Sequence, residues 1–446
     1  NIQYVLEKEL REAEQRTHAL GISAVVMNPH NGEILAMANY PTFDPNEYSK
    51  ADPLARINRA VNQVYEPGST FKVLTVGAAL EENLTTPDEM IDCLMGSILI
   101  AGHRIHDSTP HGLISVSEVL EQSSDVGAIK LGLRLGPDRF YEYVQRLGFG
   151  RPTGVDLPGE ERGLLRPPSR WSGMSLASMS MGQEVGVTPL QILSMISAVA
   201  NGGLLYRPYV VKQIQDPHKG IIETDSHGER VLTAETAAKL RPMMEGVLTE
   251  GTARSSKLEG YTSAGKTGTA QKVIDGHYSK TKFWGSFAGF APATNPTLAM
   301  IVMVDQAVGL HQGGQVAAPV FKRVMEQALR YMSVAPDVPS YAPQYKIKQE
   351  QPPQPKPAPS QVATAKYVVA DFSPRPEDET SELGDITVPD FEGKSLRQVT
   401  EESLKAGLRL QSIGSGAAVT QMPPAGASVR AGTRVQVRFS TRVSQR

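Results

Sequence analysis

A serine and a lysine three residues apart are the first side chains in this sequence that could together form a nucleophile. Ser69 and Lys72 lie in the run Pro67-Gly68-Ser69-Thr70-Phe71-Lys72, and residues three apart share one face of a helix. A free serine is a poor nucleophile, and a desolvated lysine beside it can act as its base. By itself the pair is a weak signal, because an N-cap serine followed by a surface lysine has the same spacing.

Two further short motifs could complete such a site. Ser123-Ser124-Asp125 falls just inside a helix predicted from Ser117 to Leu135, and Lys266-Thr267-Gly268-Thr269 comes just before a predicted strand. A lysine followed by small residues at a strand edge lets a substrate backbone lie alongside, while its ammonium and the hydroxyls hold a carboxylate. Alone, each motif has a simpler interpretation, as a helix cap or as a glycine-rich turn.

The order and spacing of the three motifs distinguish them from chance. Ser-x-Asp begins 54 residues after Ser69, and Lys-Thr-Gly begins 197 residues after it, an order found in penicillin-binding proteins and class A β-lactamases. Further phrases agree with the first of these families: Tyr65-Glu66-Pro67-Gly68-Ser69, Thr188-Pro189-Leu190-Gln191, Ala200-Asn201-Gly202-Gly203 and Gly265-Lys266-Thr267-Gly268-Thr269-Ala270-Gln271. From about Asn1 to Met332 the chain resembles the transpeptidase domain of a class B penicillin-binding protein of the division and sporulation branch.

The end of the chain resembles a PASTA domain, on the phrases Val388-Pro389-Asp390 and Gln421-Met422-Pro423-Pro424-Ala425-Gly426. Ten of the 32 prolines fall between Pro336 and Pro376, a composition typical of an extended linker. We therefore predict a transpeptidase domain over residues 1–333, a Pro-rich linker over 334–384 and a PASTA domain over 385–442.

The fold class predicted is α+β. Strand patterns at 22–27, 33–38, 283–290 and 298–304 enclose helical patterns at 71–82, 117–135 and 188–200, which favours an antiparallel sheet assembled from both ends around a helical subdomain. The resemblance adds that this is the penicillin-recognising serine transferase fold, with five strands in the sheet, and the PASTA domain is expected to be a small βαββ module.

The resemblance implies a role for each motif residue. Ser69 would attack the carbonyl between the last two D-alanines of a peptidoglycan stem peptide, Lys72 would take its proton, and Ser123 would relay a proton to the leaving amine. The backbone N–H groups of Ser69 and Thr269 would form the oxyanion hole. The residues expected to bind the terminal carboxylate are Lys266, Thr267, Gly268 and Thr269. An amine of a second stem peptide would then resolve the acyl-enzyme as a cross-link, without any cofactor or metal.

Asp125 stands where the family usually has asparagine. An ionised carboxylate only accepts hydrogen bonds, and its charge favours the protonated form of a neighbouring lysine. We therefore expect Asp125 to contribute to the catalytic site by pairing with Lys72 or Lys266, and to move the optimum of activity to higher pH.

Other functions remain open at this stage. A β-lactamase shares two of the motifs, but no Glu-x-x-Leu-Asn phrase is present for the deacylating glutamate of the class A enzymes. A D,D-carboxypeptidase or endopeptidase would use the same residues with water as acceptor, and a non-catalytic penicillin sensor or scaffold could also be acylated.

Two groups of side chains outside the motifs could also be functional. His103, His106 and His111, with Asp107, are spaced like possible metal ligands, although polarity of a loop beside the cleft explains them as well. Trp171, Trp284 and Tyr278 could line the substrate cleft, and core packing is at least as good an interpretation of all three.

Composition excludes several classes of function. A net charge of −2 argues against nucleic acid as a partner, and the single cysteine, Cys93, excludes an intrachain disulfide framework. No apolar stretch approaches the roughly 20 residues that span a bilayer. Because the chain opens at Asn1, we expect an N-terminal membrane anchor that is absent from it. The resemblance implies work at the extracytoplasmic face of the membrane, with stem peptides, β-lactam antibiotics, a membrane glycan polymerase and division proteins as partners.

Overall fold

The computed structural model describes residues 1–218, 220–338, 385–430 and 432–440. The chain divides into two units, Asn1–Ile347 and Lys348–Arg446. The Pro-rich stretch that we assigned to the linker lies almost wholly outside the described residues, so the linker stays a prediction. Across the described ranges, no helix combines the length and the apolar character that crossing a bilayer requires.

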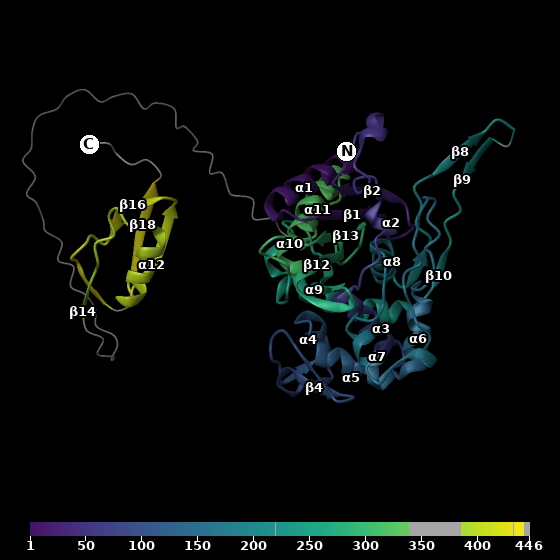
Figure 1. Ribbon diagram of the computed structural model, residues 1–446, viewed down its shortest axis with the longest axis horizontal. Coiled ribbons are helices and arrows are strands. Elements are labelled where there is room, and N and C mark those ends of the chain that lie inside the picture. The colour runs from purple at the N-terminus through teal and green to yellow at the C-terminus, as the bar shows by residue number, and fades with distance from the viewer. Residues whose placement is uncertain (219, 339–384, 431, 441–446) are drawn as a thin grey trace, which may run out of the picture. The chain divides into compact units, whose positions relative to one another are not determined.

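A five-stranded antiparallel sheet forms the centre of the larger unit (Figure 1). Its strands, in spatial order, are β11 (Ala264–Ile274), β12 (His277–Ala291), β13 (Leu298–Asp305), β1 (Gly21–Met27) and β2 (Ile34–Tyr40). Early and late segments of the chain therefore share one sheet, which confirms the predicted assembly from both ends. Strand β11 was not predicted, and the Lys-Thr-Gly motif lies inside it instead of before a strand.

Both faces of the sheet are covered, so every residue of the inner strand β1, which lies between β13 and β2, is buried. Ile22, Ala24 and Val26 point to one face, where α1 (Ile2–Thr17) and α11 (Ala318–Tyr331) pack together (Figure 1). The alternate residues Val25 and Met27 point to the other face, onto the core that contains α8 (Pro189–Ala200). Helix α8 begins with Pro189 after a capping box of Thr188 and Gln191, which satisfies its first backbone donors.

A helical subdomain lies between β2 and β11 in the chain and carries the first two motifs. Its helices are α2 (Arg59–Asn62), α3 (Lys72–Glu81), α4 (Val116–Glu121), α5 (Asp125–Leu135), α6 (Pro137–Arg146), α7 (Ser175–Ser180) and α9 (Ala234–Thr249). Four short hairpin-like pairs accompany them: β3 (Met90–Asp92) with β6 (Leu113–Ser115), β4 (Ser97–Ile100) with β5 (His103–His106), β7 (Leu204–Tyr206) with β10 (Gly228–Arg230), and β8 (Gln213–Asp216) with β9 (Gly220–Glu223). The buried helices α3 and α5 pack against each other and connect the two motifs.

The helix predicted from Ser117 to Leu135 is wrong as a single helix. It is two helices, α4 and α5, separated at Gln122–Ser124. Ser123 has φ of +64°, and the hydroxyl of Ser124 accepts a hydrogen bond from the N–H of Gly127 as the N-cap of α5. A serine side chain that bonds the backbone in this way competes with a continuous helix. The Ser-x-Asp motif therefore lies at a helix break.

In the described part of the smaller unit, helix α12 (Leu396–Lys405) packs on strands around a core of Phe391, Val399, Val435 and Val437. Its strands are β14 (Asp385–Thr387), β15 (Arg409–Gly414), β16 (Ala417–Met422), β17 (Ser428–Arg430) and β18 (Arg434–Ser440). The predicted βαββ order thus lacks β16 and β17. These two were missed because their sequences, Ala417-Ala418-Val419-Thr420-Gln421-Met422 and Ser428-Val429-Arg430, lack the sustained apolar alternation that identifies a strand.

Residues that we assigned to the start of the linker hydrogen-bond to the larger unit. The hydroxyl of Tyr261 donates to the carbonyl of Val334 at 3.0 Å, and the carboxylate of Asp337 accepts from the N–H of Thr262 at 2.7 Å and from the hydroxyl of Thr294 at 2.8 Å. The packed part of this unit therefore extends at least to Asp337.

Candidate active site

Ser69 lies in a single 3-10 turn, η2 (Gly68–Phe71), that leads directly into α3. Gly68 has φ of +54°, and a Cβ atom there would lie 2.9 Å from the carbonyl oxygen of Thr269. The N–H of Gly68 donates to the carbonyl of Gly182 at 3.0 Å. Glycine at position 68 thus permits both the left-handed backbone and the close contact of the turn with β11.

Gly268, on strand β11, likewise allows this strand to lie close to the turn that carries Ser69. A Cβ atom on it would lie 2.3 Å from the hydroxyl of Ser286 and 2.9 Å from the carbonyl of Pro67. Real side chains do not approach so closely, so only glycine lets β11 pack on the turn of Ser69. Two glycines of different motifs therefore bring Ser69 against the strand that carries Lys266, Thr267 and Thr269.

The buried amine of Lys72 connects the first motif to the second. Its Nζ atom lies 2.7 Å from Oδ1 of Asp125, 2.6 Å from the carbonyl oxygen of Ser123 and 3.3 Å from the hydroxyl oxygen of Ser123. Three acceptors match the three N–H groups of an ammonium. The pairing expected between Asp125 and one of the two lysines is thus present, and its partner is Lys72.

The unusual backbone of Ser123 makes these contacts possible. With φ of +64°, Ser123 turns its carbonyl and its hydroxyl toward the same amine. A non-glycine residue in this conformation costs about 1–3 kcal/mol, and such strain is found preferentially at functional sites. The helices before and after Ser123 are both capped at their N-termini, α4 by Ser115 with Glu118 and α5 by Ser124. The two capped helices hold the strained residue between them.

Lys266 is completely buried, and among the described residues its amine makes only a weak contact, 3.4 Å from the carbonyl oxygen of Thr267. Burial, and then the positive charge of Lys72, hold the pKa of Lys266 well below its usual range, while the charge of Asp125 opposes them. An anion that enters the site would stabilise the charged form of this amine.

A cleft of about 410 Å³ opens over these residues. Five of the eight predicted site residues line it directly: Ser69, Ser123, Asp125, Thr267 and Thr269. Lys72 and Lys266 are buried and reach it through their contacts with Ser123, Asp125 and Thr267, and Gly268 lies between the two threonines of β11. The structure thus brings all of the predicted residues into one site.

Several lining residues were not predicted from the sequence. The hydroxyl of Thr252 shares a 2.7 Å hydrogen bond with that of Thr267, and the N–H of Gly313 donates to the hydroxyl of Thr269 at 3.1 Å. His311 also lines the cleft and stacks on Phe283, with 4.2 Å between ring centroids. Thr252 and His311 lie in segments between elements, where no periodic pattern marks them, and Gly313, which lies between the lining residues Gln312 and Gly314, is the first residue of the short helix α10 (Gly313–Val316).

Of the two further groups, His111 lines this cleft, in agreement with the interpretation of a polar loop beside it, whereas Trp171, Trp284 and Tyr278 do not. His103 and His106 lie on β5 with exposed side chains, and no set of three metal-ligating side chains is assembled within the described ranges. Trp284 is buried against Tyr65 and beneath Lys272, and Trp171 donates to the carbonyl of Arg166. Core packing is therefore the better interpretation of the tryptophans.

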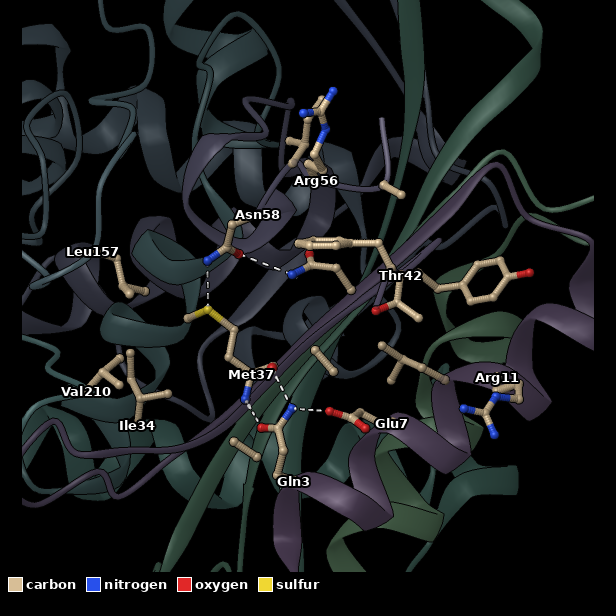
Figure 2. Close-up of a pocket in the computed structure, with 18 of the residues that line it drawn as sticks. Gln3, Glu7, Arg11, Ile34, Met37, Thr42, Arg56, Asn58, Leu157 and Val210 are labelled. Carbon is tan, nitrogen blue, oxygen red and sulfur yellow. Dashed lines mark hydrogen bonds between the residues drawn. The ribbon is translucent and has the colours of Figure 1, made fainter. Parts of the chain in front are cut away.

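A larger hollow of about 540 Å³ lies elsewhere in this unit, between α1 and the outer edge of β2 (Figure 2). There the amide of Gln3 bonds both the N–H and the carbonyl of Met37, which covers part of the exposed edge of the strand. None of the predicted site residues lines this hollow. The chemistry of the three motifs therefore belongs to the smaller cleft.

Comparison with known proteins identifies both units. Residues 22–326 match the family described as penicillin binding protein transpeptidase domain, and residues 386–441 match the PASTA domain. Stage V sporulation protein D of Bacillus subtilis is 37% identical over 444 residues, which cover 98% of this chain and 63% of that protein. Peptidoglycan D,D-transpeptidase FtsI of Escherichia coli is 35% identical over 339 residues, 75% of this chain and 56% of that protein. The chain thus spans less than two thirds of the length of these relatives.

Solved structures agree with this assignment. Penicillin binding protein 3 of Mycobacterium tuberculosis in complex with aztreonam superposes with a TM-score of 0.71 at 34% identity, covering 76% of this chain and 79% of that one. The apo transpeptidase domain of penicillin-binding protein 3 from Burkholderia pseudomallei has a TM-score of 0.67 at 32% identity, covering 76% and 96%. The fold is that of the penicillin-recognising serine transferases, and the chain belongs to the penicillin-binding protein transpeptidase family, in its class B branch, with a PASTA domain at its C-terminal end.

Proposed function

We propose that this protein is a peptidoglycan D,D-transpeptidase that forms an acyl-enzyme on Ser69 and is inhibited covalently by β-lactams. The observation that carries the proposal is the set of contacts around Lys72, whose buried amine joins Asp125 and Ser123 directly beside the turn of Ser69. A serine nucleophile needs a neighbouring group that can take its proton. The relatives named as peptidoglycan D,D-transpeptidases support the same reaction.

In the first step, the hydroxyl oxygen of Ser69 attacks the carbonyl carbon between the two terminal D-alanines. The amine of Lys72, in its neutral form, takes the hydroxyl proton, and Ser123, which contacts that amine at 3.3 Å, relays the same proton from Lys72 to the departing nitrogen. The bond between that carbon and nitrogen breaks, D-alanine leaves, and an ester remains on Ser69.

Strand β11 would orient the donor peptide. The buried amine of Lys266 and the hydroxyls of Thr267 and Thr269 face the place of the terminal carboxylate, whose charge would compensate a lysine that has no carboxylate within hydrogen-bonding distance among the described residues. The carbonyl oxygen of Thr269 is the atom nearest to a Cβ placed on Gly68. Because N–H and C=O of one strand residue point to the same side, this supports an oxyanion hole formed by the N–H groups of Thr269 and Ser69.

In the second step, an amine from a neighbouring stem peptide would attack the ester and form the cross-link. Water as acceptor would make the protein a D,D-carboxypeptidase or endopeptidase, and a site that stays acylated would make it a penicillin sensor or scaffold. The names of the relatives favour the transpeptidase. The three activities differ in what attacks the acyl-enzyme, which is an amine, water or nothing.

The substrate places the reaction outside the cytoplasmic membrane, where stem peptides are cross-linked, and we propose that the transpeptidase unit works at that face. A role in septal or spore-wall synthesis, with a membrane glycan polymerase and division proteins as partners, follows from the resemblance to Stage V sporulation protein D and FtsI alone. Anchoring by an upstream segment stays a prediction.

The proposal is tested with a D-Ala-D-Ala-terminated stem pentapeptide, or a thioester analogue, and a D-amino acid as acceptor. Transpeptidation yields the acceptor-exchanged peptide and free D-alanine in equal amounts, and the Ser69→Ala variant yields neither. Release of D-alanine without exchange at saturating acceptor would mean a carboxypeptidase, and acylation by penicillin without any peptide turnover would mean a sensor.

A further inference from the structure

The carboxylate of Asp107 holds the beginning of α5 by three hydrogen bonds. Its Oδ1 atom accepts from the N–H of Asp125 at 2.6 Å and from the N–H of Val126 at 3.0 Å. Its Oδ2 atom accepts from the hydroxyl of Ser124 at 2.8 Å. Both carboxylate oxygens are thus used, and they satisfy donors at the first turn of α5, where an acid is favourable.

These contacts lie directly next to the groups that surround Lys72. The backbone N–H of Asp125 bonds Asp107, while the side chain of the same residue bonds Lys72. Ser124 follows Ser123, whose carbonyl and hydroxyl oxygens both contact Lys72 from a backbone with φ of +64°. Any movement of the carboxylate of Asp107 is therefore passed to Asp125 directly through its backbone, and to Ser123 through the neighbouring residue Ser124.

Asp107 is itself held in place from outside α5. Its N–H donates to the carbonyl of Gly96 at 2.9 Å. Gly96 has φ of +75°, and a Cβ atom there would lie 3.3 Å from the Cβ of Asp107 and 2.8 Å from the Cα of Pro110. The segment around residue 96 thus packs closely against the loop of Asp107, so the carboxylate has a fixed position relative to the subdomain.

We propose that Asp107 is a positioning residue for acylation, which sets the places of Ser123 and Asp125 around the amine of Lys72. The inference deepens the proposed function and rests on it. Asp107 touches neither substrate nor Ser69, so its effect runs through the helix break alone. It also accounts for the carboxylate that the sequence placed in a possible metal cluster, because both of its oxygens are occupied by donors of α5.

Three substitutions separate geometry from charge. Asp107→Asn keeps an oxygen at the place of Oδ1 and removes the charge, so the rate constant of acylation should fall only about threefold. Asp107→Glu keeps the charge but is one methylene longer, and Asp107→Ala removes the acceptors. Both should slow acylation by about 10- to 100-fold, because a displacement of about 1 Å at a catalytic group can cost that much.

The matched control is Asp156→Ala. The carboxylate of Asp156 also accepts two backbone N–H groups, those of Val210 and Val211, at 2.7 Å each, and none of these residues lines the cleft. Its acylation rate constant should stay within twofold of that of the parent chain. In a single-turnover reaction with a chromogenic cephalosporin the amplitude reports the folded fraction and the rate constant reports the site, so a folding defect is recognised separately.

A double-mutant cycle with Ser123→Ala completes the test. If Asp107 acts partly by placing the hydroxyl of Ser123, Asp107→Ala should slow the Ser123→Ala variant by a smaller factor than it slows the parent chain. Equal losses in both backgrounds, or a rate that follows charge so that Asn is slow and Glu is normal, would overturn the inference. A crystal structure of Asp107→Asn and Asp107→Glu checks it without activity: Glu should separate Lys72 from Asp125 beyond 4 Å, and an unmoved pair would contradict the inference even if the parent chain did not acylate.

Discussion

The amine of Lys72 and the carboxylate of Asp125 form an ion pair of 2.7 Å, in which the lysine side chain is fully buried and that of the aspartate is 28% exposed. The contact places a carboxylate, which only accepts hydrogen bonds, directly against the group expected to take the proton of Ser69. The family usually has an asparagine at this position, whose amide would both donate and accept hydrogen bonds.

Asp125→Asn should move the rise of the acylation rate with pH toward lower pH, because it removes the negative charge that lies 2.7 Å from the amine of Lys72. The measurement is the second-order rate constant for benzylpenicillin between pH 5 and pH 10. Glu402→Gln is a matched control, since Lys394 and Glu402 also lie 2.7 Å apart but in the other unit. Identical profiles for Asp125→Asn and the parent chain would contradict this account of Asp125.

Gly182→Ala should slow acylation by tenfold or more, because its Cβ would lie 2.1 Å from the carbonyl oxygen of Gly68 and would push the turn of Ser69 away from β11. Gly159→Ala is the control. Gly159 also has positive φ, +75° against +85°, but a Cβ there has open space around it. Both variants should lose about 1 kcal/mol of stability to backbone strain, and only Gly182→Ala should lose the acylation rate. An equal effect of the two on the rate would show that the contact with Gly68 is unimportant.

Lys266→Met and Lys272→Met should change stability in opposite directions. Lys266 is buried without an acidic partner at bonding distance among the described residues, so methionine should stabilise the larger unit by about 1 kcal/mol. Lys272 bonds the buried Asp305 at 2.7 Å, and its loss leaves that carboxylate with only Arg59, at 4.0 Å. Lys272→Met should therefore destabilise by about 2–3 kcal/mol. Denaturant unfolding of both variants measures the two signs, and a destabilised Lys266→Met would show that the amine has an anionic partner in solution.

The stability of the parent chain should also rise with pH in the alkaline range through Lys266. Its pKa is lowered in the folded protein from the usual 10.5, so between the folded and the unfolded value the unfolded chain binds a proton that the folded chain lacks. By linkage the free energy of unfolding then increases with pH over that interval. In Lys266→Met this part of the slope should disappear. Parallel pH dependences of the two proteins would mean that Lys266 stays charged when the chain folds.

A chain ending after residue 338 should keep the melting temperature of the larger unit, whereas one ending after residue 333 should melt about 2–6 °C lower. The shorter chain loses the hydrogen bonds of Val334 and Asp337 to Tyr261, Thr262 and Thr294, worth about 1 kcal/mol each at most. Asp337→Ala in the longer chain should give part of the same loss. Equal melting temperatures for the two chains would place the end of the packed unit before residue 334.

The order of three motifs was enough to predict which side chains meet in the cleft, because those side chains are chemically distinctive. The strands β1, β12 and β13 could also be predicted, since their buried residues are apolar and continuous. The residues that hold the motifs in place carry no such signal. Strand β11 begins with small and polar residues, which are buried by close backbone contact with the turn of Ser69 and not by their own hydrophobicity.

The break at Ser123 and the cap of Asp107 could not be predicted for a similar reason. The segment 117–135 has the helical periodicity of one helix, and the start of α5 depends on the local cap of Ser124 together with contacts to Asp107, about 18 positions earlier in the chain. The local sequence pattern describes only the helix propensity of a segment, whereas the hydrogen bonds to Asp107 form only when the subdomain has assembled. The spacing of Asp107 and three histidines suggested a metal site for the same reason. The sequence shows that these residues are close along the chain, but it does not show that hydrogen-bond donors of α5 occupy the carboxylate of Asp107.

The central claim is that Ser69 is the acylated nucleophile, and mass spectrometry of the intact protein after incubation with benzylpenicillin tests it most directly. The account predicts a stable mass increase equal to one penicillin, located by peptide mapping to Ser69 and absent in Ser69→Ala. An adduct that persists in Ser69→Ala, or drug hydrolysis without any adduct, would contradict it.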